Sequence, residues 1–245
     1  MRRTAGRVTA VLTLLLLVLL AVGCSVREEL VLSPDGSGSA NLRVDLHPIM
    51  LDYMNDLMAA MTGVEGEYPI FDLDQIVSSF AERDGLELVS ANQLSRGSLE
   101  LNVRFADINE IFEREGATEI LSLEQSGSRR ELTVRLDREA VRRFLEFAPE
   151  ESTTMAQFLF PPVDGSVSRE EYRDEMAWAL EEYDDPATVQ RVLDEAEIEV
   201  RIRPEGSIVS QRGGEIDGAT VVFRIPLLVL LTLEETRTYS LVFEP

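Results

Sequence analysis

The chain of 245 residues has no lysine, one histidine and one cysteine. Without lysine it has no phosphate-loop lysine, no Schiff base and no serine–lysine dyad. A single cysteine cannot form a disulfide within the chain, and a single histidine cannot build a zinc site that needs several histidine or cysteine ligands. We therefore expect a protein that is not an enzyme, with no catalytic residue, no cofactor and no metal site.

Two catalytic alternatives remain in principle, and both are weak. His47 is the only base for a serine-type triad, but it precedes Pro48 at an expected strand-to-helix junction, where we interpret it as a surface or capping residue. Adjacent carboxylates such as Glu170 and Glu171 resemble a hydrolase pair. Since the chain holds 45 acidic residues, such pairs arise by chance, and solvated faces explain them. Acid-dependent hydrolysis is thus a minor alternative.

Basic residues are scarce relative to acidic ones, and the formal net charge is −22. Nucleic acid is excluded as a partner, because its binding depends on basic patches that release phosphate counterions. An anionic membrane surface also repels such a chain on average. Attachment to a membrane therefore requires an anchor.

Residues 1–23 have the layout of a lipoprotein signal peptide. Three arginines precede an apolar run over residues 8–22, which is shorter than the roughly 20 residues of a spanning helix. The tetrapeptide Ala21-Val22-Gly23-Cys24 resembles the bacterial lipobox, which implies cleavage between Gly23 and Cys24 and acylation, including palmitate, on Cys24. The alternative is an uncleaved anchor with an incidental cysteine.

The predicted anchor determines where the protein works. Lipid on Cys24 makes the membrane its first partner and places it in the cell envelope, exposed to the periplasm or the cell exterior. Ser25 follows the cysteine in place of an aspartate, which favours sorting to an outer membrane in a Gram-negative cell. The choice between inner and outer membrane stays open.

Residues 24–245 predict a single α+β envelope domain, with antiparallel sheets and amphipathic helices packed on one face. Strands alternate at residues 28–32 and 40–46, and the order strand, strand, helix occurs twice between residues 86 and 147. Helices are expected at residues 47–63, 72–83, 168–183 and 186–196, and further strands from residue 198 onward. Two closely packed lobes, residues 24–160 and 161–245, are the alternative.

Two apolar segments are candidates for ligand contact. Met50, Met54, Met58 and Met61 share one face of the first expected helix, and methionine adapts to apolar ligands of varied shape. The alternative is a helix stripe buried in the core. The aliphatic run at residues 227–231 belongs to a strand expected at residues 227–233, and we expect it to be buried on both faces. The alternatives are a cavity wall and a segment that faces a membrane.

Two segments carry a resemblance to a known family. A strand directly after the cysteine leads into Ser33-Pro34-Asp35-Gly36-Ser37-Gly38, and a Gly-Gly pair at 213–214 precedes the strand Ala219-Thr220-Val221-Val222-Phe223. This plan resembles the LppM-type bacterial lipoproteins, and spirochaete-type lipoproteins of unknown role are similar. The resemblance implies an α+β envelope domain linked to lipid binding.

Together these features predict a lipid-anchored, non-enzymatic envelope lipoprotein that binds an apolar ligand or lipid. The alternative is an acidic adaptor or structural lipoprotein that binds another envelope protein through its charged surface.

Overall fold

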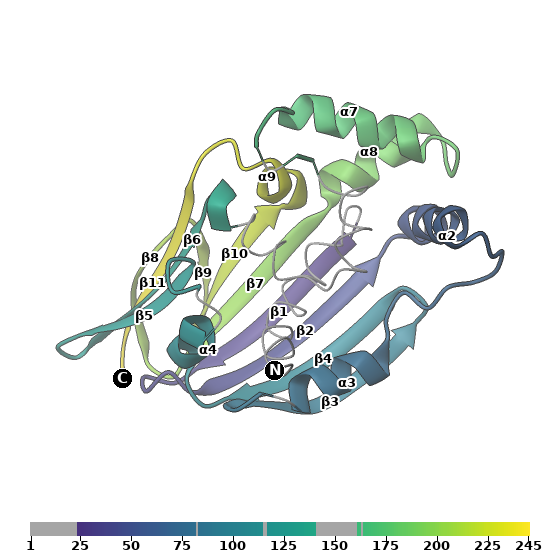
Figure 1. The fold of residues 1–245 in the computed structure, drawn as a ribbon. Helices are drawn as coiled ribbons and strands as arrows, with labels where there is room; N and C mark the ends of the chain where they lie inside the picture. Colours follow the sequence, from purple (N-terminus) through teal and green to yellow (C-terminus); the bar gives the residue numbers. More distant parts are fainter. Residues whose placement is uncertain (1–23, 82, 115–116, 141–160, 163) are drawn as a thin grey trace, which may run out of the picture.

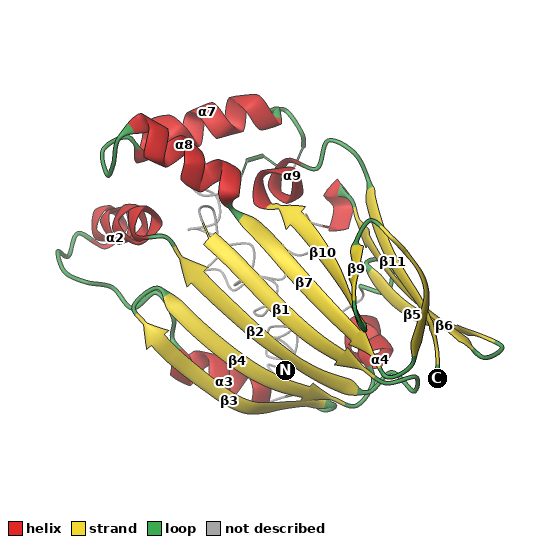
Figure 2. Ribbon diagram, turned by 180° about the vertical axis from the view of Figure 1, so that it is seen from behind, coloured by secondary structure: helices red, strands yellow, loops and turns green. Residues whose placement is uncertain are grey.

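The computed structural model describes residues 24–81, 83–114, 117–140, 161–162 and 164–245. The predicted signal peptide, residues 1–23, lies outside the described residues. So does most of the second helix of the strand, strand, helix order, which was expected to end at residue 147. The chain has an α+β fold built on two mostly antiparallel sheets, as the sequence predicted (Figures 1 and 2).

The larger sheet has seven strands, and the strand that begins at the cysteine lies at its centre. All neighbouring pairs are antiparallel except β1 and β7, which are parallel. In spatial order the strands are β3 (Leu86–Ser95), β4 (Ser98–Phe105), β2 (Gly38–Leu46), β1 (Cys24–Leu32), β7 (Glu197–Pro204), β10 (Thr220–Pro226) and β9 (Glu215–Asp217).

The smaller sheet has four strands, and all of its neighbours are antiparallel. In spatial order they are β5 (Leu121–Ser126), β6 (Arg129–Leu136), β11 (Arg237–Glu244) and β8 (Ser207–Arg212). Each sheet therefore combines strands from before residue 160 with strands from after it.

Helices connect the strands and gather mainly at one end of the larger sheet. The described helices are α2 (Pro48–Thr62), α3 (Leu73–Ala81), α4 (Ile108–Arg114), α7 (Arg169–Leu180), α8 (Pro186–Glu195) and α9 (Leu227–Thr232). α3 packs against β3, whereas α2, α7, α8 and α9 lie together beyond the end of the sheet where β1 begins (Figure 1).

The β1–β2 hairpin follows the predicted alternation. Leu42, Val44 and Leu46 are buried on one face while the residues between them stay partly or fully exposed. Asp35 stabilises the turn, because its Oδ1 accepts a hydrogen bond from the backbone N–H of Ser37 at 3.0 Å. This turn also contacts the turn that follows β7, because Ser33 Oγ donates a hydrogen bond to Glu205 Oε2 at 2.9 Å.

The two sheets meet where β10 lies near β11. The rings of Phe223 and Tyr239 make an edge-to-face contact with centroids 5.7 Å apart. The chain passes from β8 in one sheet to β9 in the other through Gly213 and Gly214. Gly213 has φ +84°, and a Cβ on Gly214 would lie 2.7 Å from the ring of Phe223, so this crossing requires glycine.

Two predicted helix starts are confirmed. His47 caps α2, since its Nδ1 accepts from the N–H of Ile49 at 3.4 Å, a long hydrogen bond. Ser168 and Glu171 form a reciprocal capping box at the start of α7. The single histidine therefore has a structural role.

The prediction of a buried strand at residues 227–233 is wrong. Residues 227–232 form the short helix α9, which begins after Pro226 at the end of β10 and is capped at its C-terminus by Leu233, with φ 24°. Most side chains of α9 are buried on every side of the helix. A continuous aliphatic run is therefore as compatible with a helix in the core as with a buried strand. Length and apolar content alone do not separate the two.

Candidate functional site

The end of the larger sheet at Cys24 is the first candidate site. β1 begins at Cys24 itself, with no spacer, and Cys24 pairs with Leu46 at the end of β2. Ser25 pairs with Glu197 at the start of β7, and Glu197 pairs with Pro226 at the end of β10. At this end of the sheet, β2 therefore continues into α2, β7 follows directly from α8, and β10 continues into α9.

Aromatic and polar contacts join the helices at this end. Tyr53 of α2 meets Tyr183, just after α7, in an edge-to-face contact with centroids 6.1 Å apart. Tyr183 donates its hydroxyl to Asp56 Oδ2 at 3.0 Å, and burial together with this hydrogen bond raises the pKa of Tyr183 to about 12. Burial also raises the pKa of Tyr172 above its ordinary range. Both phenols are neutral donors at physiological pH.

The four methionines of α2 occupy different environments. Met50 and Met54 are buried, Met58 is half-buried and Met61 is 42% exposed. The stripe therefore runs from the core at the start of the helix to the surface at its end. A ligand on this face would meet Met58 and Met61, whereas Met50 and Met54 already pack against the protein.

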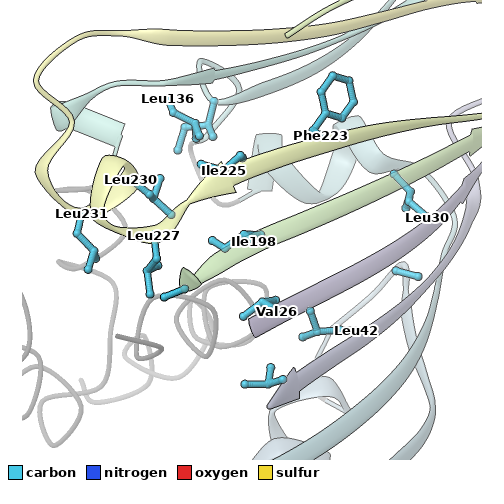
Figure 3. Packing of buried hydrophobic residues seen from close by; sticks show 14 of the residues in the cluster. Val26, Leu30, Leu42, Leu136, Ile198, Phe223, Ile225, Leu227, Leu230 and Leu231 are labelled. Atoms are coloured by element: carbon cyan, nitrogen blue, oxygen red, sulfur yellow. The ribbon is translucent and has the colours of Figure 1, made fainter. Parts of the chain in front are cut away.

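Sequence reasoning missed a third candidate, the carboxyl of Glu28 on the central strand. Val26, Glu28, Leu30 and Leu32 project from the same face of β1, and the other three are buried. Figure 3 shows Val26 beside Leu42 and Ile198 of the neighbouring strands in the apolar cluster on this face. The alternation itself was the available signal, because a charge falls where the pattern requires an apolar side chain.

The opposite face of the sheet is polar, and several of its charges form ion pairs. Glu199 lies at its centre with its side chain only 13% exposed, and it contacts Arg27 at 3.2 Å, Arg224 at 3.2 Å and Arg201 at 3.6 Å. Arg201 also pairs with Asp217 at 2.9 Å. We name the face that carries Glu28 the inner face and the face that carries Glu199 the outer face.

A fourth candidate is an exposed aromatic side chain on α7. Trp178, the only tryptophan of the chain, is 77% exposed. Asp174 and Glu175 lie one helical turn before it, and Glu181 and Glu182 follow at three and four residues; all four are exposed. The tryptophan therefore stands in an acidic surface.

Two further properties of the described residues bear on function. Within the described ranges, no three histidine, cysteine, aspartate or glutamate side chains come together in a group able to hold a metal ion. In the same part of the chain, no helix has both the length and the apolar character needed to cross a membrane.

Comparisons with known proteins give one structural likeness. No family model matches the sequence, and no curated protein matches it either. Among solved structures, the chain is similar to the NMR structure of the folded domain of Mycobacterium tuberculosis LppM. The likeness covers 91% of each chain with 14% sequence identity and a TM-score of 0.41.

Proposed function

We propose that the protein is a lipid-anchored lipoprotein of the bacterial envelope that has no enzymatic activity and holds an apolar ligand or lipid. The observation that carries the proposal is the position of Cys24 as the first residue of the central strand. Acylation there attaches the larger sheet to the bilayer without a linker. Acyl chains stabilise such attachment by about 0.8 kcal/mol per buried methylene, and more than one chain makes it durable.

The geometry around Cys24 fits a protein that works at a bilayer surface. α2, α8 and α9 adjoin the strands at this end, so in the anchored protein they lie next to the lipid headgroups. Met61 and Val64 are exposed at and just after the end of α2. A lipid molecule that moves out of the membrane can contact these two apolar side chains.

The inner face supports the ligand part of the proposal. It is apolar over most of the seven strands, and Val200 at its centre is half-buried. Met58 of α2 is half-buried as well. An apolar chain that covers such side chains gains about 25 cal/mol for each Å² removed from water.

The test is to purify the acylated protein under native conditions and extract it with organic solvent, which removes bound lipid but leaves the covalent acyl groups on Cys24. Mass spectrometry should find about one extracted lipid per chain. Met58→Gln should reduce this amount, whereas Val209→Gln, an exposed position on β8, should not. A protein that yields no extractable lipid contradicts the ligand proposal.

A second candidate function is an acidic adaptor that binds a basic envelope protein. Trp178 and the four carboxylates around it favour this function, since tryptophan is a frequent binding anchor and attracts cations over its ring. Charge attraction of this kind speeds association and weakens with salt.

The adaptor is tested by capture of partners from envelope extracts. A basic partner should be retained at about 50 mM salt and released at about 500 mM, where screening is nearly complete within a few ångström. Trp178→Ala should abolish retention, and Val209→Ala should leave it unchanged. Retention that persists in Trp178→Ala excludes this surface as the contact.

A further inference from the structure

The face of α7 that carries Trp178 points away from the rest of the protein. Three residues spaced by four, Tyr172, Met176 and Leu180, are buried, and this stripe faces the helices against which α7 packs, α8, α9 and α2. Trp178 lies two residues from both Met176 and Leu180, which is about 200° around the helix. Trp178 is 77% exposed. The ring therefore projects from the side of α7 opposite to its contacts.

This face lies at the end of the molecule where Cys24 begins β1. Figures 1 and 2 show α7 outside α8, on the side away from the strands. α8 leads directly into β7, and β7 begins beside Ser25. Since acylation attaches Cys24 to the bilayer without a linker, the outward face of α7 lies close to the headgroups of the same membrane.

The surroundings of Trp178 are acidic. From the start of α7 to the end of α8 the chain carries ten acidic side chains and three arginines, a formal charge of −7. The two arginines of α7 form ion pairs on other sides of the helix, Arg169 with Glu234 at 2.9 Å and Arg173 with Asp194 at 2.8 Å. Four exposed carboxylates lie within one helical turn of the tryptophan and can meet a partner: Asp174, Glu175, Glu181 and Glu182.

The carboxylates decide what this face can contact. A tryptophan alone is suited to the headgroup region of a bilayer. The carboxylates around it are repelled by anionic lipids, and they lose hydration when they enter a membrane. They attract cations, and a guanidinium also stacks over a tryptophan ring. The face therefore complements a basic segment of a protein better than it complements a lipid surface.

We propose that Trp178 and the four carboxylates around it bind a basic segment that directly adjoins the membrane-spanning part of an integral membrane protein. The inference rests on the proposed adaptor function and on the anchor at Cys24. An arginine of the segment stacks over the ring of Trp178, and neighbouring cations pair with the carboxylates. Basic side chains next to a spanning helix extend toward the membrane surface, which places them level with α7.

Attachment to the same bilayer supplies affinity that these contacts alone lack. Each exposed ion pair or cation–ring contact changes a dissociation constant by about fivefold at most. A partner tethered to the same membrane is held at a high effective concentration, which strengthens binding by about a hundredfold or more. The surface therefore selects partners that share its membrane over basic chains in solution.

The experiment uses the full acylated protein in phosphatidylcholine vesicles, which carry no net charge. The probe is an arginine-rich peptide of about ten residues, either free or carrying a palmitoyl chain, with a fluorophore that accepts energy from tryptophan. Because Trp178 is the only tryptophan, energy transfer reports contact at this face. The palmitoylated probe should bind about a hundredfold more tightly than the free probe, and about 500 mM salt should abolish the transfer.

Two pairs of substitutions with the same change in net charge locate the contact. Glu181→Gln together with Glu182→Gln should weaken binding of the palmitoylated probe by about tenfold, because two carboxylates beside the tryptophan are lost. Glu124→Gln together with Glu131→Gln, two exposed positions on the smaller sheet, should weaken it by less than about twofold. Both variants keep Trp178, and circular dichroism verifies that each is folded. An equal loss in the two variants overturns the contact at α7.

The other outcomes separate this inference from the proposals on which it rests. Equal affinity for the free and the palmitoylated probe overturns the membrane-adjoining partner and leaves the adaptor function standing. No binding of either probe overturns both. Strong quenching of Trp178 by brominated lipid before any probe is added shows that the ring enters the bilayer, which overturns a protein partner at this face. Wild-type protein that does not stay with the vesicles overturns the anchor and the inference with it.

Discussion

Substitution of Met50 and of Met61 by alanine should have very different effects on stability, because one side chain lies in the core and the other at the surface. Met50 is 0% exposed and Met61 is 42% exposed, although both lie on the face that the sequence marked as a stripe. Met50→Ala removes three heavy atoms from a packed site and leaves a cavity, which destabilises the fold by about 2–5 kcal/mol. Met61→Ala removes atoms that water already reaches, and should change stability by less than about 0.5 kcal/mol.

The assay is thermal unfolding followed by circular dichroism, with both variants in the same amphipathic polymer as the wild type. For a domain of this size, each kcal/mol shifts Tm by about 2–4 °C. A loss of about 3 kcal/mol for Met50→Ala therefore lowers Tm by about 6–12 °C, and Met61→Ala should stay within about 2 °C. Equal shifts for the two variants would refute the assignment of Met50 to the core and Met61 to the surface.

Three further substitutions test other parts of the structure. Because burial raises the pKa of Glu28 above the ordinary 4.5, ionisation of its carboxyl destabilises the fold as pH rises. In thermal unfolding scans between about pH 4 and 8, the Tm of Glu28→Leu should therefore increase relative to the Tm of the wild type as pH rises. A Tm difference that does not change with pH, or the same increase in Glu29→Leu, contradicts this. Gly214→Ala should lower stability by about 1–3 kcal/mol in thermal unfolding, since the new Cβ lies 2.7 Å from the ring of Phe223; an unchanged Tm would show that the ring moves freely. Ser168→Ala removes the cap of α7 and should cost about 1 kcal/mol, with Ser168→Asp as the variant that retains stability.

Local patterns in the sequence predicted the features that depend on short stretches of chain. The β1–β2 hairpin was predictable because its alternation and the Asp35-Gly36 turn lie within a few residues of each other. The caps at His47 and Ser168 were predictable for the same reason. The α+β class followed from the order of these elements.

Features that depend on distant parts of the chain were not predictable. The parallel pairing of β1 with β7 joins residues more than 170 positions apart, and no local pattern encodes it. The helix at residues 227–232 has the same composition as a buried strand, and its contacts decided between the two. Burial of Met50 and exposure of Met61 also depend on which elements lie against α2.

The site was predictable only in part. Cys24 was marked by its place in a lipobox-like sequence, and its acylation stays a prediction. The charge of Glu28 was visible in the alternating strand, but its meaning required the register of β2 and β7, which sets apolar residues on both sides. Trp178 gave no signal of exposure, because its neighbours along the helix include both buried and solvated residues.

Metabolic labelling with radioactive palmitate tests most directly whether the seven-stranded sheet is attached to a bilayer through Cys24, the first residue of its central strand. Cells that express the wild-type chain should incorporate label into a membrane-bound protein, and Cys24→Ser should incorporate none. If the wild-type protein is exported, folded and freely soluble without label, the anchor does not exist and the envelope function built on it is wrong.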